Sequence, residues 1–282
     1  MSGKLYLCGT PIGNLADFSP RAVDALKNAD LIAAEDTRVT LKLLNHFGIK
    51  TPLTSYYEHN KIKKGDLLIE KLLSGDSIAL VSDAGMPVIS DPGEDLVRRC
   101  RENGIEVTVI PGPCAAISAL ALSGINGARF AFEGFLPSAK KERAARLCEI
   151  KNDTRTLIFY EAPHKLAGTL YDLHAAFGDR EIALCREITK KFEEVLYMSL
   201  SDAAAHFKET APKGEFVLVV SGESPEKLEK ERRDALPTPE ELLKIKASEG
   251  LYGKELVKAV SEELSLPKRE VYSIYLKAEN KL

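Results

Sequence analysis

Residues 77–93 read Ser-Ile-Ala-Leu-Val-Ser-Asp-Ala-Gly-Met-Pro-Val-Ile-Ser-Asp-Pro-Gly. The run that ends at Val81 is apolar and has the length of a buried strand. The loop that follows is rich in Ser, Asp, Gly and Pro, and a helical pattern begins after Gly93. An ordinary strand-to-helix loop is shorter and needs fewer Gly and Pro residues. Because open α/β sheets bind ligands at the carboxyl ends of their strands, this loop predicts a ligand site.

Three further junctions of the same kind lie in the first 124 residues. Strands are predicted over residues 4–8, 30–34 and 106–110. Each runs into a polar or Gly-Pro loop and then into a helical pattern, of which the one from Ser19 to Asn28 begins with a Ser-Pro capping pair. Repeated alternation of strand and helix predicts a mostly parallel sheet.

The loop after residues 30–34 carries Glu35, Asp36 and Arg38. Two carboxylates and a guanidinium past a strand end are candidates for acid–base chemistry. The alternative is a helix start with acidic residues in its first turn, which the helix dipole favours. The sequence alone leaves both interpretations open.

The pattern changes near residue 124. The following part predicts a second α/β lobe with some antiparallel pairing, and a cleft between the two lobes is the expected binding site. The predicted strands cover 130–134, 156–160, 181–186, 194–200 and 215–220, and the main helices cover 166–177 and 201–210.

The C-terminal part predicts a small helical module. Residues 223–239 form an expected linker, rich in Glu, Lys, Arg and Pro, and residues 240–282 hold helical patterns over 240–246, 253–264 and 268–277. The last two resemble a helix-turn-helix, whose second helix begins with Lys268 and Arg269. A helical cap without a nucleic-acid role is the alternative. The expected domains are therefore 1–124, 125–222, 223–239 and 240–282.

The composition of the chain argues against several classes of protein. The 282 residues carry a formal net charge of −3, which argues against sequence-blind coating of nucleic acid by a basic surface. Five scattered Cys without a CxxC pair, and His residues without ligand spacing, predict no disulfide framework and no metal site. We expect a cytoplasmic protein without a signal sequence or a membrane span.

The strand-end motifs taken together resemble those of one family. They cover residues 9–15 (Gly-Thr-Pro-Ile-Gly-Asn-Leu), 34–38 (Ala-Glu-Asp-Thr-Arg), 82–87 (Ser-Asp-Ala-Gly-Met-Pro) and 111–113 (Pro-Gly-Pro), with 161–164 (Glu-Ala-Pro-His) and 186–190 (Arg-Glu-Ile-Thr-Lys). The chain resembles the tetrapyrrole-methylase superfamily, a two-lobed α/β fold of class III methyltransferases. Within it, the chain looks like the ribosomal RNA small-subunit methyltransferase I branch over nearly its whole length.

The resemblance implies an activity and partners. It implies S-adenosylmethionine-dependent 2′-O-methylation of a cytidine ribose in small-subunit ribosomal RNA, carried out on RNA within the ribosomal subunit by a homodimer. A small-molecule methylase of the same fold, acting on a tetrapyrrole, is the first alternative. A nucleic-acid-binding regulator without enzymatic activity is the second. The basic cluster near residue 140 and the terminal helices favour the RNA methylase.

The resemblance also implies site residues. The expected cofactor site comprises Asp83, Ala84, Gly85, Met86, Pro87, Cys114, Ala115, Tyr160, Glu161 and Ala162. Asp36 is the expected proton acceptor, Arg38 the cation that stabilises the alkoxide, and Glu35 the substitute base. Expected RNA contacts are Thr10, Pro11, Asn14, Tyr56, Tyr57, His59, Lys140, Lys141, Arg143, Arg146, His164, Lys268 and Arg269.

Overall fold

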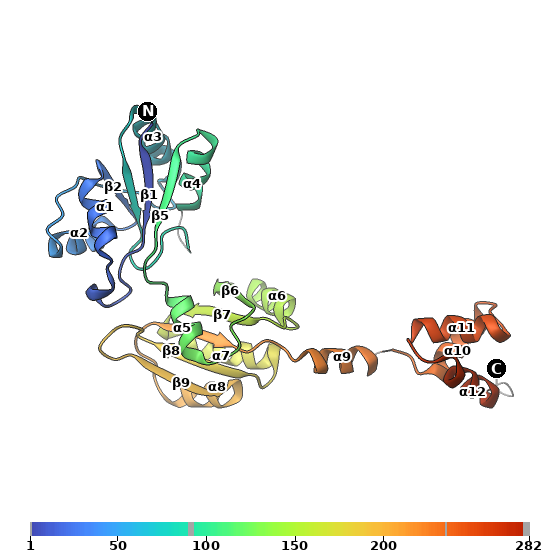
Figure 1. Ribbon diagram of the computed structural model, residues 1–282. Helices are drawn as coiled ribbons and strands as arrows, with labels where there is room; N and C mark the ends of the chain where they lie inside the picture. The colour runs from blue at the N-terminus through green and yellow to red at the C-terminus, as the bar shows by residue number, and fades with distance from the viewer. Residues whose placement is uncertain (1, 90–92, 235, 279–282) are drawn as a thin grey trace. The chain divides into compact units, whose positions relative to one another are not determined.

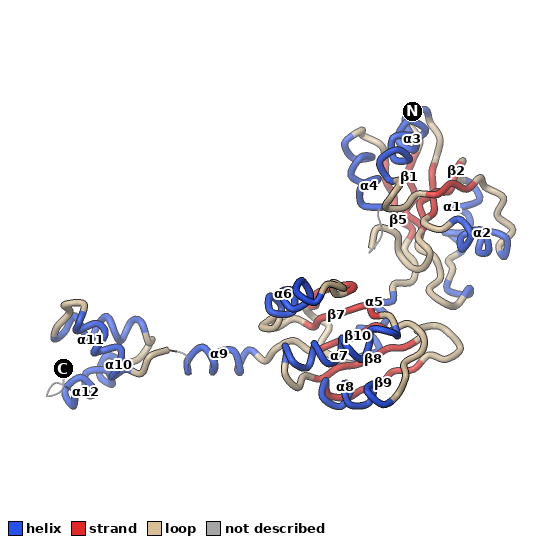
Figure 2. The backbone as a smooth tube through the Cα atoms, turned by 180° about the vertical axis from the view of Figure 1, so that it is seen from behind, coloured by secondary structure: helices blue, strands red, loops and turns tan. Residues whose placement is uncertain are grey.

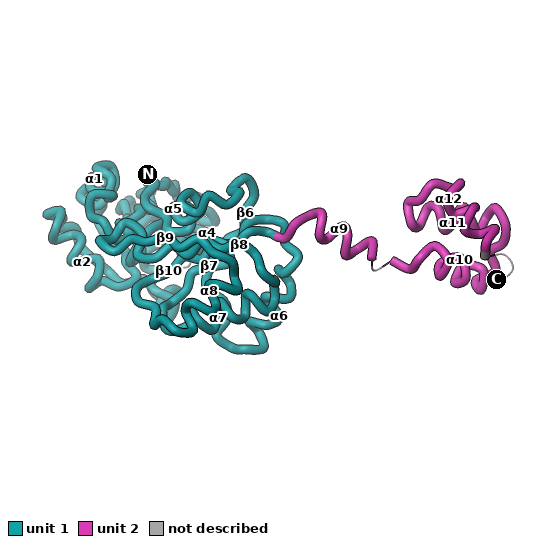
Figure 3. The backbone as a smooth tube through the Cα atoms, turned by 90° about the horizontal axis from the view of Figure 1, so that it is seen from below, with its two compact units in different colours: residues 1–222 teal, residues 223–282 magenta. Residues whose placement is uncertain are grey.

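The computed structural model describes residues 2–89, 93–234 and 236–278 (Figure 1). Ser90 to Pro92, part of the predicted ligand-binding loop after residue 81, therefore lie outside the described residues. The chain divides into two compact units, residues 1–222 and 223–282, which Figure 3 distinguishes by colour. The division falls where the expected linker begins.

A parallel five-stranded sheet forms the first lobe of unit 1. Its strand order is β3-β2-β4-β1-β5, with β1 Lys4–Cys8, β2 Leu31–Ala34, β3 Leu53–Ser55, β4 Ile78–Val81 and β5 Glu106–Ile110. This confirms the predicted parallel sheet. The three-residue strand β3 was not predicted, because its sequence carries too short an apolar pattern to stand out.

Helices cover both faces of this sheet, as Figure 1 shows. Side chains of α1 and α2 share one core with the sheet, and side chains of α3 and α4 share another. The predicted Ser-Pro start of α1 is confirmed, since Ser19 Oγ accepts the N–H of Ala22 and Pro20 is the first helical residue. The bounds are α1 Pro20–Asn28, α2 Thr37–His46, α3 Lys61–Ser74 and α4 Gly93–Glu102.

A second five-stranded sheet forms the other lobe of unit 1. Its order is β6-β7-β10-β8-β9, and only the β6–β7 pair is parallel. The strands are β6 Phe130–Phe135, β7 Thr156–Glu161, β8 Glu181–Arg186, β9 Glu194–Ser199 and β10 Phe216–Val220. The predicted strands of this lobe are all present, within two residues at their ends.

The second sheet is also covered on both faces. Helices α6 (Lys140–Ile150), α7 (Pro163–Phe177) and α8 (Leu200–Glu209) contribute to a core on one face, and α7 and α8 lie side by side there (Figure 2). Helix α5 (Ala115–Ser123), which follows β5 of the first lobe, packs on the other face. The chain thus passes between the lobes at α5, and this helix belongs to the same unit as both sheets.

Unit 2 contains four helices within its described residues. They are α9 Pro225–Asp234, α10 Pro239–Ser248, α11 Gly253–Glu263 and α12 Lys268–Ala278. The last three share a small apolar core around Leu243, Leu256 and Val260, whereas α9 has no buried residue. The segment expected as a linker therefore contains a solvated helix. A tight turn joins α11 to α12, in which Ser261 Oγ donates to the carbonyl of Leu266 at 2.7 Å.

Candidate functional site

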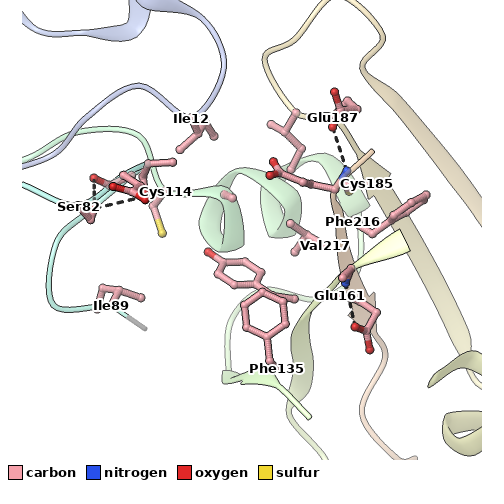
Figure 4. A pocket seen from close by; sticks show the side chains of 18 of the residues that line it. Ile12, Ser82, Ile89, Cys114, Phe135, Glu161, Cys185, Glu187, Phe216 and Val217 are labelled. Atoms are coloured by element: carbon pink, nitrogen blue, oxygen red, sulfur yellow. Dashed lines mark hydrogen bonds between the residues drawn. The ribbon is translucent and has the colours of Figure 1, made fainter. Parts of the chain in front are cut away.

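One pocket of about 560 Å³ in unit 1 is lined by residues of both lobes (Figure 4). Its first wall is the loop after β4, and its second wall comes from the ends of β6, β7, β8 and β10. The start of α5 contributes Cys114 and Ala115. The pocket therefore lies past the carboxyl end of β4, where the sequence predicted a ligand site.

Nine of the ten residues predicted to bind a cofactor line this pocket. They are residues 83–86, 114–115 and 160–162. The tenth, Pro87, is buried and does not belong to the lining. Its ring fixes the backbone of the loop behind the pocket wall.

The loop after β4 is fastened to the loop after β1. The backbone N–H of Thr10 donates to the carbonyl of Gly85 at 2.9 Å, and the N–H of Gly85 donates back at 3.1 Å. The Thr10 hydroxyl is buried and donates to the carbonyl of Ser82 at 3.2 Å. The prediction that Thr10 contacts the substrate is therefore wrong, because its side chain is occupied in holding the pocket wall.

The loops after β1 and β5 meet at two glycines. A Cβ atom on Gly112 would lie 2.8 Å from the Cα atom of Gly9, and a Cβ on Gly9 would lie 2.7 Å from the Cα of Gly112. The N–H of Gly112 also donates to the sulfur of Met86 at 3.2 Å. Three strand ends can converge beneath the pocket only because neither glycine carries a side chain.

Tyr160 connects the second lobe to the start of α5. Its hydroxyl accepts the N–H of Ala116 at 3.2 Å, and its ring packs edge-on against Phe132 and Phe135. Burial raises the pKa of the Tyr160 hydroxyl, so the group stays protonated at neutral pH. The arrangement gives the pocket an aromatic wall with one hydroxyl.

The Glu161 carboxylate belongs to a buried network of hydrogen bonds and an ion pair. Its carboxylate accepts the N–H of Ala162 at 2.8 Å and the hydroxyl of Thr169. The Thr169 oxygen accepts Nη2 of Arg143 at 3.0 Å, and Nε of Arg143 lies 3.0 Å from the carboxylate of Asp172. The mostly buried Arg143 guanidinium thus joins α6 to α7, and its binding to RNA phosphate stays a prediction without support from this geometry.

The three predicted catalytic residues differ in their position relative to the pocket. Glu35 lines the pocket, whereas Asp36 and Arg38 do not. Asp36 caps α2 by accepting the N–H of Arg38 at 2.8 Å, and the Arg38 guanidinium lies 2.6 Å from its carboxylate. The N–H of Asp36 donates to the carboxylate of Asp83 at 3.0 Å. The structure thus supports the helix-capping alternative for Asp36.

The Arg38 side chain lowers the pKa of Asp36 to about 2 through its hydrogen bonds to the carboxylate. A carboxylate with so low a pKa is a weak base at neutral pH. Because its oxygens already accept hydrogen bonds from Arg38, the proton-acceptor role stays a prediction without support from the geometry.

The predicted RNA contacts fall into two groups, and none of them lines the pocket. The side chains of the first group are buried in the core or already have a partner within the protein. The Tyr56 side chain lies in the core, so the prediction that it stacks on a base is wrong. The Asn14 side chain accepts the N–H of Ala16 and caps a short 3₁₀ helix, Leu15–Asp17. Arg146 is ion-paired with Glu133 at 2.6 Å.

The second group is accessible to solvent. It comprises Pro11, Tyr57, His59, Lys140, Lys141, His164, Lys268 and Arg269. Their roles stay predictions, since exposure permits a contact with RNA but does not establish one.

Sequence reasoning missed the contribution of the segment after β8. Glu187, Ile188 and Lys190 line the pocket, together with Glu215, which directly precedes β10. The motif at residues 186–190 follows β8, which is antiparallel to both of its neighbours. The rule that places ligand sites at strand ends concerns parallel sheets, so it assigns this motif no role.

The chain was compared with known proteins. A family model described as Tetrapyrrole (Corrin/Porphyrin) Methylases matches residues 4–204. This chain belongs to the tetrapyrrole methylase family. The match covers the first lobe completely and most of the second, and thus every strand except β10.

Two relatives show the branch of the tetrapyrrole methylase family. "Ribosomal RNA small subunit methyltransferase I" of Halalkalibacterium halodurans is 49% identical over 275 residues, which cover 97% of this chain and 94% of the relative. The protein of the same name from Thermotoga maritima is 48% identical over 220 residues, which cover 78% of this chain and 99% of the relative. The recognition of this branch from the sequence is confirmed.

Solved structures confirm the fold. A diphthine synthase structure superposes with a TM-score of 0.61 at 16% identity, covering 81% of this tetrapyrrole methylase and 94% of that chain. A Thermus thermophilus uroporphyrin-III C-methyltransferase, solved in complex with S-adenosylhomocysteine, superposes with a TM-score of 0.55 at 17% identity, covering 78% and 98%. At these identities the likeness concerns the fold alone.

Within the described residues, no helix has the length and apolar character needed to cross a membrane. In the same residues, no group of three or more His, Cys, Asp or Glu side chains is arranged to hold a metal ion.

Proposed function

We propose that this chain transfers the methyl group of S-adenosylmethionine to the 2′-hydroxyl of a cytidine ribose in small-subunit ribosomal RNA. The observation that carries the proposal is the pocket at the end of β4, lined by nine of the ten predicted cofactor residues. Membership of the ribosomal RNA small subunit methyltransferase I branch, at 49% identity over nearly the whole chain, supports the acceptor.

The pocket suits this cofactor in size and in charge. A volume of about 560 Å³ is that of a site for a drug-sized molecule. Its charged lining consists of five carboxylates, those of Glu35, Asp83, Glu161, Glu187 and Glu215, and of Lys190. Such an excess of negative charge favours a ligand with a cationic sulfonium.

Methyl transfer from a sulfonium needs mainly alignment. When bound, the cofactor supplies an electrophilic methyl group. The protein must hold the 2′-oxygen in line with that group and exclude water, and such positioning is worth about 7–11 kcal/mol in favourable cases. The ribose hydroxyl must also lose its proton, and Glu35 is the predicted base that lies in the pocket lining.

Asp36→Asn tests whether the Asp36 carboxylate accepts the proton of the ribose hydroxyl. Asparagine caps helices as well as aspartate does, so the fold should be kept. Because Asp36 is engaged by Arg38 outside the pocket lining, we expect turnover to fall by less than about tenfold, with cofactor affinity unchanged. Single-turnover kinetics would measure this. A loss of about 100-fold or more would return Asp36 to the role of proton acceptor.

The function itself is tested by binding and product analysis. Calorimetric titration should show saturable binding of S-adenosylmethionine by the purified chain. Incubation with small ribosomal subunits that lack the modification should yield a 2′-O-methylated cytidine, identified by mass spectrometry of nucleosides. A uroporphyrinogen acceptor serves as the comparison. Cofactor binding with methylation of the tetrapyrrole alone would favour the small-molecule methylase.

Lys140 and Lys141 are the proposed RNA contacts of the second lobe. They occupy the first turn of α6, where positive charge opposes the helix dipole, so helix stability does not explain them. Both are exposed, and neither belongs to an ion pair among the described residues. Their ammonium groups are thus available to phosphate.

The double substitution Lys140→Glu, Lys141→Glu should weaken RNA binding by about tenfold at low salt and reduce the salt slope by about two. Thermal stability should stay equal or rise, since carboxylates suit a helix start. Filter binding over a salt series measures the RNA affinity and its salt slope. The pair Lys27→Glu, Lys50→Glu changes the net charge equally at exposed sites and is the matched control. Equal behaviour of the two double variants would remove this assignment.

A homodimer and a cytoplasmic location complete the proposal. Helix α5 is apolar at every position except Ser118 and Ser123, and one side packs on the second sheet. Ile117 and Leu122 on its other side are exposed, as is Val109 on β5. An exposed apolar area of this kind is typical of a surface that a second copy covers.

A further inference from the structure

Lys190 is the one cationic side chain in the lining of the pocket, as far as the described residues go. Its ammonium lies 3.0 Å from the carboxylate of Glu187 and 2.7 Å from that of Glu215. Its Nζ is thus placed by two neighbours, in a pocket wall that otherwise carries negative charge. A lone cation among carboxylates is unfavourable for the sulfonium, so its presence calls for another explanation.

The backbone that carries Lys190 is strained. Glu187 and Thr189 have φ angles of +51° and +66°, in the left-handed region that residues with a side chain rarely adopt. Such strain persists where the surroundings enforce it, and it clusters at functional sites. Here the N–H of Thr189 donates to Glu193, and the Thr189 hydroxyl accepts the N–H of Asn14 at 3.1 Å.

The loop after β1 leaves room for this segment. A Cβ on Gly13 would lie 2.5 Å from Cγ of Lys190 and 2.8 Å from the Thr189 hydroxyl. The first lobe therefore packs directly on the Lys190 side chain. This contact restricts the aliphatic part of the Lys190 side chain, whose ammonium the two carboxylates hold.

The two carboxylates hold Lys190 unequally. The Glu187 side chain is 19% exposed and also accepts the N–H of Glu215 at 2.9 Å, so it is a fixed partner. The Glu215 side chain is 81% exposed, and its contact with Lys190 is an ion pair at the surface. Exposed ion pairs contribute little to stability, so an incoming anion can replace the Glu215 carboxylate.

We propose that Lys190 binds an anionic oxygen of a ligand in this pocket, in exchange for the carboxylate of Glu215. The inference rests on the proposed function, which offers two sources of that oxygen. One is the carboxylate in the methionine part of S-adenosylmethionine, and the other is a phosphate of the RNA strand next to the target ribose. Lys190 is thus a binding and positioning residue, and Glu187 keeps its ammonium in place.

Lys190→Gln tests the proposal and separates the two sources. Calorimetry with S-adenosylmethionine is compared with 5′-methylthioadenosine, which lacks the amino-acid part. If Lys190 binds the cofactor carboxylate, affinity for S-adenosylmethionine falls about tenfold and affinity for methylthioadenosine stays unchanged. If it binds a phosphate, both affinities stay unchanged, RNA affinity falls and the salt slope decreases by about one.

Three further variants distinguish ligand binding from a purely structural role. Glu215→Gln should tighten the same ligand, because it frees Lys190 from its exchangeable partner, whereas a structural ion pair predicts no gain. Lys191→Gln is the matched control, since Lys191 is the exposed neighbour outside the pocket lining. Lys190→Arg keeps the charge and should retain most of the affinity.

Several results would overturn the inference. Equal losses for S-adenosylmethionine and methylthioadenosine would mean that Lys190 only supports the pocket wall. Unchanged affinity for both the cofactor and RNA in Lys190→Gln would mean that it binds neither. If the wild type itself bound neither cofactor nor RNA, the proposed function would fail, and this inference with it.

Discussion

Replacing Gly112 with valine is expected to destabilise the first lobe and to abolish cofactor binding. The Cβ of residue 112 would approach the Cα and carbonyl carbon of Gly9 at 2.8 and 2.9 Å, and both are backbone atoms that cannot turn aside. We expect a loss of about 3 kcal/mol in the free energy of unfolding, at the upper end for overpacking. Urea denaturation followed by circular dichroism measures it.

The loss should extend to the pocket because the same contact supports its floor. The N–H of Gly112 donates to Met86, a residue of the lining, so separating the loops after β1 and β5 displaces that side chain. Gly168→Ala is the control. Nothing lies within 4 Å of the Cβ it would add inside α7, and alanine there should stabilise by about 0.5–1 kcal/mol. Wild-type stability of Gly112→Val would contradict the close approach of the two loops.

Prediction from sequence succeeded where one local rule decides the structure. The apolar run at residues 77–81 gave β4, which is buried along its length, and the loop after it gave the first wall of the pocket. A strand buried on both faces has a composition that few other structures share. Its position in the sheet between β1 and β2 then follows from the parallel pairing.

Prediction from sequence was weakest where the surroundings of a side chain depend on distant partners. Arg143 belongs to a run of basic residues, and only the fold reveals that Thr169 and Asp172 on α7 take up its guanidinium. Tyr56 follows β3 directly, a strand that the sequence did not reveal, so its burial could not be inferred. Long-range partners of this kind are not encoded in the local pattern.

The relatives bear on the role of unit 2. The Thermotoga maritima relative is covered to 99% by a match of 220 residues, about the length of unit 1. A protein of the same name thus exists with little sequence beyond that length. The roles of Lys268 and Arg269 in unit 2 stay predictions.

Filling the pocket is expected to have the largest effect on activity. Ala162 lines the pocket and precedes α7 with extended backbone angles (φ −83°, ψ 146°) and no capping hydrogen bond from its side chain. Tryptophan is compatible with that backbone and would occupy space that the cofactor needs. We expect steric overlap to cost about 3 kcal/mol or more, roughly a 100-fold rise in the dissociation constant of S-adenosylmethionine.

Ala139→Trp is the matched control for this substitution. Ala139 precedes α6 in the same way, with extended angles (φ −71°, ψ 122°) and no capping bond, but it lies outside the pocket lining. The two variants add the same side chain at equivalent positions of two helices. Only Ala162→Trp should lose binding in calorimetry, while both keep their thermal stability. If both variants bound the cofactor like the wild type, the cofactor would lie elsewhere, and the assignment of this pocket would be wrong.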